Sequence, residues 1–182
     1  MVATVDLLSG GRVIFGAGAG WYKPEFEAYS VWDENPIRVL KFKEGLRLMK
    51  RLWTENTVNF DGRYYKAKEA VLLPKPIQKP YPPIWFGTLG EYMLKLAAKH
   101  GDGWISNIGP QIRPSIKTSQ EVIEKLQRYR KAARKDKKFT IAISGGIEDG
   151  SKRVEELRNL GCDYYILSGI QAPPGAPSLW SA

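Results

Sequence analysis

Short apolar runs separated by glycine, proline and polar residues divide the chain into alternating strand-like and helix-like segments. Strands are predicted at residues 12–16, 83–87, 103–106, 139–144 and 163–168. These runs are continuously apolar rather than alternating, which is typical of strands covered on both faces. Most of them lead into a helix-like segment, so the pattern predicts a parallel α/β construction with helices on the outside.

The helix-like segments have apolar positions that recur three and four residues apart. Helices are predicted over residues 36–53, 91–100, 113–138 and 152–160. Pro36 is a favourable first helical residue, because its missing N–H would be unpaired there in any case. Pro24 interrupts the segment before it, so no helix is expected between the first strand and Pro36.

Two further segments have their own signals. Asp61 and Gly62 lie between strand-like residues in the segment 58–65, which indicates a β-hairpin. Residues 171–182 are rich in proline and have no periodicity, so a disordered tail is expected there. Residues 1–170 are expected to form one domain.

Composition excludes several classes of protein. The 182 residues contain one cysteine and one histidine, so disulfide frameworks and Cys/His metal clusters are excluded. No apolar run approaches the roughly 20 residues that span a bilayer, and no signal peptide follows Met1. A soluble, cytoplasmic protein without a membrane partner is expected. Cys162, in an apolar run, is interpreted as a buried strand residue.

The positive charge gathers in one segment. Residues 113–138 contain ten Lys or Arg and three Asp or Glu, which is +7 of the total charge of +9. The segment also has helical periodicity, so a solvated outer helix face explains it. A nucleic-acid interface is the alternative, but no aromatic cluster or docking motif accompanies the charge, and no nucleic-acid partner is expected.

Two glycine-containing loops are candidates for ligand binding. The loop after the first strand, GAGAG at 16–20, departs from the dinucleotide fingerprint, because position 21 is Trp and no helix is expected at once. Its glycines either admit a flat ligand or make a tight turn. The second loop runs from Gly87 through Thr88 and Leu89 to Gly90, between a strand and a helix N-terminus. Unpaired N–H groups there favour a phosphate; the alternative is a helix cap with glycine for tight packing.

Three single residues stay open between a structural and a functional interpretation. His100 ends a predicted helix, where it can interact with the last carbonyls. Trp104 is either core or a flat surface against a ring-shaped ligand. Glu25 is either a loop anchor or a catalytic carboxylate, so no catalytic residue is assigned.

Five motifs follow one another along the chain. They are LSGGRVIFGAGAGW at 8–21, the helix from Arg38 to Trp53, PIQKPYPPIWFG at 76–87, LAAKHGDGW at 96–104 and EELRNLGCDYYILS at 155–168. Their order resembles the luciferase-like monooxygenase family, whose members use reduced flavin or deazaflavin. Together the motifs extend over most of the chain. This is much more specific than either glycine pattern alone.

The resemblance implies a TIM-type (β/α) barrel that binds FMN or the deazaflavin coenzyme F420 at the carboxyl ends of its strands. It implies a phosphate at Gly87, Thr88, Leu89 and Gly90. It also implies a cofactor and substrate cavity lined in part by the other loop, at Gly18, Gly20 and Trp21.

The chain also departs from the family pattern. A complete barrel takes roughly 250 residues, so a partial barrel of about five parallel strands with a hairpin insertion is expected, without the first three βα units. Such an oxidoreductase would act on a small organic substrate, and as a homo-oligomer or with a complementing N-terminal half. The alternative is a catalytically silent module that binds the cofactor or its phosphate.

Overall fold

The computed structural model describes residues 1–29, 32–106, 116–145 and 150–167. The chain divides into two compact units, Met1–Phe86 and Gly87–Ala182. The expected tail at 171–182 and residues 113–115 of the basic segment lie outside the described residues.

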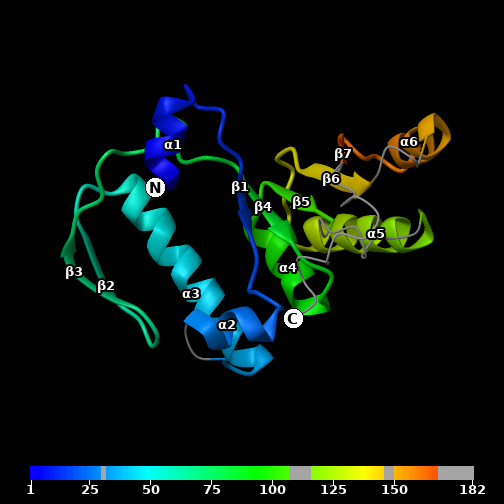
Figure 1. The fold of residues 1–182 in the computed structure, drawn as a ribbon. Helices are drawn as coiled ribbons and strands as arrows, with labels where there is room; N and C mark the ends of the chain where they lie inside the picture. The colour runs from blue at the N-terminus through cyan, green and yellow to red at the C-terminus, as the bar shows by residue number, and fades with distance from the viewer. Residues whose placement is uncertain (30–31, 107–115, 146–149, 168–182) are drawn as a thin grey trace, which may run out of the picture. The chain divides into compact units, whose positions relative to one another are not determined.

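The helices and strands follow the predicted order, with two additional helices before residue 35 (Figure 1). The first unit contains α1 (Val2–Leu8), β1 (Phe15–Ala17), α2 (Lys23–Tyr29), α3 (Asn35–Thr54), β2 (Val58–Asp61) and β3 (Lys66–Ala70), and β4 (Ile84–Gly87) ends at its boundary. The second contains α4 (Glu91–His100), β5 (Gly103–Ile105), α5 (Ile116–Ala132), β6 (Thr140–Gly145), α6 (Gly150–Asn159) and β7 (Tyr164–Leu167).

The five predicted strands form one sheet, and the predicted hairpin is separate. The strand order is β1-β4-β5-β6-β7, with β2 and β3 in a two-stranded sheet. Within the first unit β1 pairs parallel to β4, with Phe15 opposite Ile84. Within the second, β5 pairs parallel to β6 and β6 to β7. The parallel α/β prediction is therefore confirmed.

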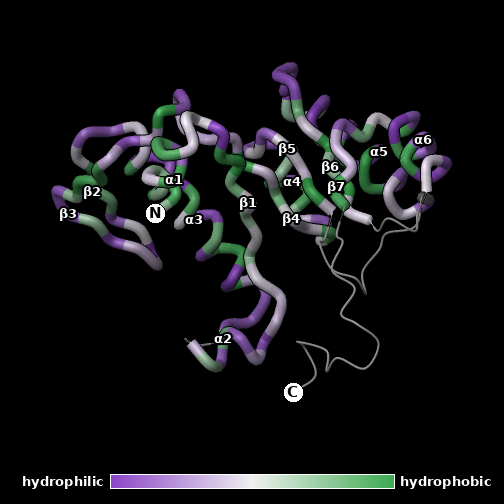
Figure 2. Tube along the Cα trace, turned by 45° about the horizontal axis from the view of Figure 1, so that its top comes forward, coloured by the Kyte–Doolittle hydropathy of each residue, from purple (hydrophilic) through white to green (hydrophobic). Residues whose placement is uncertain are grey.

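Burial follows the apolar runs in the middle strands but not in the last one. Ile84 and Phe86 of β4, and Ala142 and Ile143 of β6, are fully buried, and β6 has hydrophobic colours in Figure 2. β7 differs, because it ends the strand order and, among the described residues, β6 is its only pairing partner. Its Tyr164 and Leu167 are 55% and 59% exposed, so the prediction that every strand is covered on both faces is wrong for β7.

Cys162 is also placed differently from the prediction. It lies before β7 rather than inside it, and its side chain is only half-buried. Its thiol donates to the carbonyl of Tyr164 at 3.0 Å. Burial nevertheless raises the pKa of this thiol.

α2 is the helix that the sequence interpretation excluded. It begins at Lys23, so Pro24 stands in its first turn, where a missing N–H breaks no helical hydrogen bond. The ring of Phe26 packs edge-on against Trp32 with centroids 5.6 Å apart. Pro24 therefore starts a short helix instead of interrupting the segment.

The hairpin has a longer connection than the Asp61–Gly62 signal indicated, because β3 begins only at Lys66. The carboxylate of Glu44 on α3 holds this connection. It accepts backbone N–H bonds from Arg63, Tyr64 and Tyr65 at 3.1, 2.7 and 2.8 Å. One side chain from a preceding helix thus fixes this four-residue connection, together with the hydrogen bond that the Gly62 N–H donates to the Tyr65 carbonyl at 3.0 Å.

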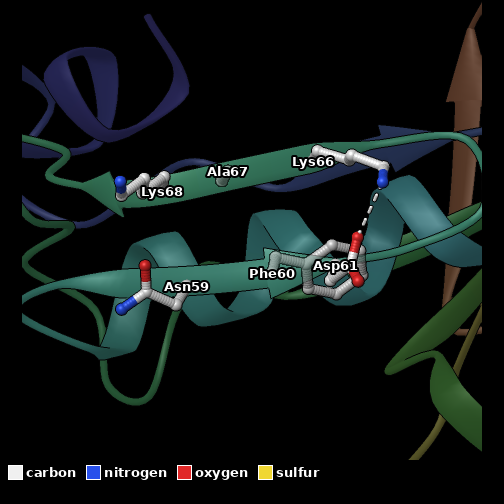
Figure 3. Close-up of a pocket in the computed structure, with 6 residues that line it drawn as sticks. All are labelled: Asn59, Phe60, Asp61, Lys66, Ala67 and Lys68. Atoms are coloured by element: carbon white, nitrogen blue, oxygen red, sulfur yellow. Dashed lines mark ion pairs between the residues drawn. The ribbon is translucent and has the colours of Figure 1, made fainter.

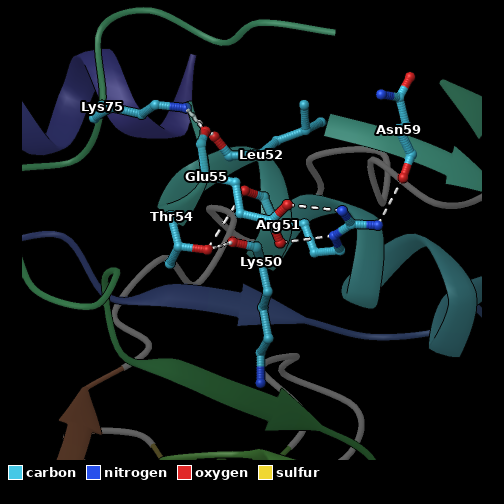
Figure 4. A network of polar contacts seen from close by, with 7 residues as sticks. All are labelled: Lys50, Arg51, Leu52, Thr54, Glu55, Asn59 and Lys75. Carbon is cyan, nitrogen blue, oxygen red and sulfur yellow. Dashed lines mark hydrogen bonds and ion pairs between the residues drawn. The ribbon is translucent and has the colours of Figure 1, made fainter. Parts of the chain in front are cut away.

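The end of α3 is joined to the segments that follow it by a polar network (Figure 4). The guanidinium of Arg51 donates to both carboxylate oxygens of Glu55 at 2.7 Å and to the carbonyl of Asn59 at 2.8 Å. The ammonium of Lys75 donates to the carbonyls of Leu52, at 2.7 Å, and Glu55. A cation at the helix C-terminus satisfies carbonyls that lack intrahelical partners.

α1 is anchored through a carboxylate that exposes no surface to solvent. Asp6 accepts hydrogen bonds from the backbone N–H and the side-chain amide of Gln78, at 3.0 and 2.7 Å. The same amide donates to the carbonyl of Val13 at 2.8 Å. Desolvation would raise the pKa of Asp6, but the hydrogen bonds from Gln78 and its neighbours outweigh it and lower the pKa.

Candidate functional site

The loop between β4 and α4 is fixed to the core by a tryptophan. Trp104 on β5 is completely buried, and its indole N–H donates to the carbonyl of Thr88 at 2.6 Å. This settles the open question about Trp104, which is a core residue. The bond also commits the Thr88 carbonyl, the negative end of a peptide dipole, to the indole N–H.

The backbone beside Gly90 is open. Gly90 is the N-cap of α4, with φ −67° and ψ 135°, and no side chain caps the helix. A Cβ on Gly90 would meet no described atom within 4 Å, and one on Gly87 would meet only Ile105, at 3.8 Å. Tight packing within the described protein therefore does not explain these glycines. The first N–H groups of α4 have no side-chain cap among the described residues, and such groups favour an anion.

Glu91, the residue that follows this loop, is contacted by two side chains of α5. Glu91 forms ion pairs with Lys95, at 3.7 Å, and with Lys125, at 3.6 Å. The hydroxyl of Tyr129 donates to the same carboxylate. The negative charge near the helix N-terminus is thus compensated by two ammonium groups.

The other three predicted cofactor residues lie in the first unit. Gly18 and Gly20 are exposed, and Trp21 is 69% exposed with its ring 5.3 Å from that of Tyr22. Gly20 has φ +79°, and a Cβ there would lie 2.3 Å from the ring of Phe26. The conformation and packing of the first unit by themselves require this glycine. The structure thus groups Gly87, Thr88, Leu89 and Gly90 in one loop and these three in another.

A pair of buried hydroxyls was not found from the sequence. Ser106 follows β5 and Ser144 lies in β6, both at the carboxyl ends of their strands and both buried. Their hydroxyl oxygens are 3.3 Å apart, and the Ser144 N–H donates to the Ser106 hydroxyl at 2.8 Å. Serines at the ends of apolar runs are too common to be recognised without the strand register.

The remaining candidates have no visible catalytic arrangement. Glu25 is exposed in the first turn of α2, and His100 is exposed at the end of α4. The described ranges contain no group of three His, Cys, Asp or Glu residues placed to hold a metal ion. Among the helices of the described residues, none has the length and apolar character needed to cross a membrane.

One hollow lies on the hairpin (Figure 3). Phe60 and Ala67 contribute apolar surface, and Lys66 pairs with Asp61 at 3.0 Å beside them. Asn59 and Lys68 complete the lining residues. None of the residues predicted to bind a cofactor lines this hollow.

Comparison with known proteins confirms the resemblance carried by the motifs. Residues 1–165 match the family described as luciferase-like monooxygenase. The chain is 33% identical over 107 residues to the FMNH(2)-dependent dimethylsulfone monooxygenase of Pseudomonas putida, covering 58% of this chain and 30% of that protein. It is 34% identical over 131 residues to the F420-dependent glucose-6-phosphate dehydrogenase of Amycolatopsis mediterranei, covering 68% and 39%. The chain thus spans well under half the length of these relatives.

Solved structures agree on the fold. An F420-dependent secondary alcohol dehydrogenase in complex with an F420-acetone adduct superposes with a TM-score of 0.76 at 20% identity, covering 92% of this chain and 67% of that chain. The monooxygenase RslO1 from Streptomyces bottropensis superposes with a TM-score of 0.66 at 28% identity, covering 86% and 48%.

Proposed function

We propose, on the premise that the chain belongs to the luciferase-like monooxygenase family, that it is the cofactor-binding part of an oxidoreductase that uses reduced FMN or coenzyme F420. Curated relatives of both cofactor types support this, since one is FMNH(2)-dependent and another F420-dependent. The bound ring would supply the hydride or oxygen chemistry. The protein would bind it, orient it and exclude water. The single cysteine is compatible with a reducing cytoplasm.

The observation that carries the proposal is the open, uncapped N-terminus of α4. Both cofactors contain a phosphate group, and the N–H groups that follow Gly90 have no side-chain cap. Because Trp104 engages the Thr88 carbonyl, that oxygen is directed toward a donor rather than toward the anion. Thr88 can add its hydroxyl as a further donor. Gly87, Thr88, Leu89 and Gly90 would therefore hold the phosphate.

The test is a substitution at Gly90. Asp is a good N-cap residue, and a Cβ at Gly90 meets no described atom, so Gly90→Asp should leave the fold intact. Its carboxylate would accept the free N–H groups and repel a phosphate, so FMN and F420 binding should be lost. Gly90→Ala adds bulk without charge and should weaken binding less. Thr88→Val should cost about 0.5–3 kcal/mol of binding free energy, the range for one hydrogen bond.

Cofactor titration followed by flavin or deazaflavin fluorescence measures these affinities, and circular dichroism checks the fold. Riboflavin, which has no phosphate, is the matched control ligand, and its binding should not respond to Gly90→Asp. An unchanged affinity for FMN and F420 in a folded Gly90→Asp protein would place the phosphate elsewhere.

A catalytically silent binding module is the second candidate. It is favoured by one observation, which is that the matched regions cover only 30% and 39% of the curated relatives. A partial barrel can anchor a phosphate without enclosing a reaction. Turnover of a reduced cofactor by the purified 182-residue chain, tested with a panel of small organic substrates, would exclude this candidate. Turnover that requires association of copies, or an added N-terminal half, would support an assembled enzyme.

A further inference from the structure

Glu91 presents a problem for anion binding at the start of α4. It is the first residue after the Gly90 cap, so its carboxylate is a built-in competitor for the same N–H groups. A carboxylate in the first turn ordinarily interacts favourably with those groups and with the helix dipole. A phosphate could bind there only if this side chain is kept away.

The contacts of Glu91 all draw it toward the flank of α4 that faces α5. Lys95 lies one turn further along α4 and pairs with Glu91 Oε1 at 3.7 Å. Lys125 on α5 pairs with Oε2 at 3.6 Å, and the Tyr129 hydroxyl donates to Oε1. Both carboxylate oxygens are therefore engaged by groups that lie beyond the first residue of the helix.

Tyr129 is itself held in place. It is half-buried, and its ring has the ammonium of Lys95 and the guanidinium of Arg128 each 5.4 Å from its centroid. Cations at this distance from an aromatic face are attracted to it. The hydroxyl that binds Glu91 is thus carried by a ring with restricted freedom.

We infer that Tyr129 and Lys125 are positioning residues that hold the Glu91 carboxylate against α5 and so keep the N-terminus of α4 available to the phosphate of the cofactor. This rests on the proposed function, because it assumes that the phosphate binds at residues 87–90. Neither residue needs to touch the cofactor. Their effect passes through Glu91, whose charge otherwise opposes binding.

Tyr129→Phe is the decisive variant, since it removes the hydroxyl and changes no charge. Without the hydrogen bond from the Tyr129 hydroxyl, the Glu91 carboxylate can approach the N-terminus of α4. Moving a unit charge from about 10 Å to about 6 Å from a phosphate dianion should raise the Kd by about sixfold at an effective dielectric constant near 40. The expected result is that FMN binds about sixfold more weakly while riboflavin binds unchanged.

The Glu91→Gln background separates positioning from structure. If Tyr129 acts through the charge of Glu91, Tyr129→Phe should have no effect on FMN affinity once Glu91 is Gln. Lys125→Met should weaken FMN binding more than Lys131→Met, which removes the same charge from the same helix; no contact of the Lys131 side chain with Glu91 is seen in the described residues. F420 and its phosphate-free deazaflavin core form a second ligand pair for the same titrations.

The outcomes are distinguishable. If wild-type protein prefers the phosphate-bearing ligand but Tyr129→Phe leaves that preference unchanged, the inference is overturned and the proposed function stands. Equal weakening of FMN and riboflavin would assign Tyr129 a merely structural role and also overturn it. If wild-type protein binds neither phosphate-bearing ligand more tightly than its phosphate-free partner, the phosphate site itself is wrong and the role of Glu91 falls with it.

Discussion

Trp104→Phe tests whether one buried hydrogen bond organises the loop between β4 and α4. The substitution keeps an aromatic ring at a fully buried position but removes the indole N–H that donates to the Thr88 carbonyl at 2.6 Å. The carbonyl then loses its donor. The loop then loses this link to β5.

The expected loss of stability has two sources. The missing hydrogen bond contributes about 0.5–1.5 kcal/mol, and the smaller ring leaves a space that costs on the order of 1 kcal/mol. Together they predict an unfolding free energy lowered by about 1.5–2.5 kcal/mol. Trp21→Phe is the matched control. Its side chain is 69% exposed, so its unfolding free energy should change by less than about 0.5 kcal/mol.

Urea unfolding followed by circular dichroism measures both variants, and FMN titration at low temperature measures the loop. Because the loop backbone is less ordered in Trp104→Phe, FMN affinity should fall about three- to tenfold, in proportion to the ordering that binding must now supply. Equal unfolding free energies for the two variants would show that the Trp104–Thr88 bond stabilises nothing. An unchanged FMN affinity would show that the loop does not depend on it.

Two further predictions concern carboxylates that join distant segments. Glu44→Gln should lower the thermal midpoint at pH 7, and the difference from wild type should vanish in acid. Desolvation raises the pKa of Glu44, but the backbone N–H bonds from the hairpin connection outweigh it and lower the pKa below the ordinary 4.5. The stability that the Glu44 carboxylate contributes is therefore lost as pH falls through that lowered pKa. Thermal scans from pH 7 to pH 3 measure this, and midpoints that stay apart would contradict it. Asp6→Asn should lower the unfolding free energy in urea by about 2–4 kcal/mol, because an amide places a donor against one of the two donors of Gln78.

The sequence predicts helices, strands and buried positions correctly where local signals and burial agree. The strand over residues 84–87 and the helix over residues 91–100 are where the apolar runs placed them, and Met93, Leu94, Leu96 and Ala97 are buried as their spacing predicts. Glycines at both ends of α4 punctuate the chain in agreement with the periodicity. In such segments propensity, pattern and packing all favour one structure.

The sequence does not predict the local structure where a residue far away in the chain determines it. Nothing in the hairpin residues shows that Glu44, about twenty positions earlier, will bind their backbone. Nothing in the apolar run of β7 shows that it ends the sheet and keeps Tyr164 and Leu167 exposed. The prediction at Pro24 is wrong for another reason. A proline that stops a helix and one that begins it look the same until the first turn is located.

The two glycine loops show the same limit at the candidate site. In the sequence alone, both loops follow a predicted strand and contain glycines, and both are candidates for ligand binding. In three dimensions Gly20 has a left-handed conformation with the ring of Phe26 where a Cβ would stand, whereas Gly90 has an ordinary conformation and no described atom near its missing side chain. The first glycine is therefore explained within the first unit. The second is an N-cap, where glycine is about as favourable as threonine but less favourable than aspartate, asparagine or serine, so the Gly90 variants test whether a bound group also needs the bare backbone.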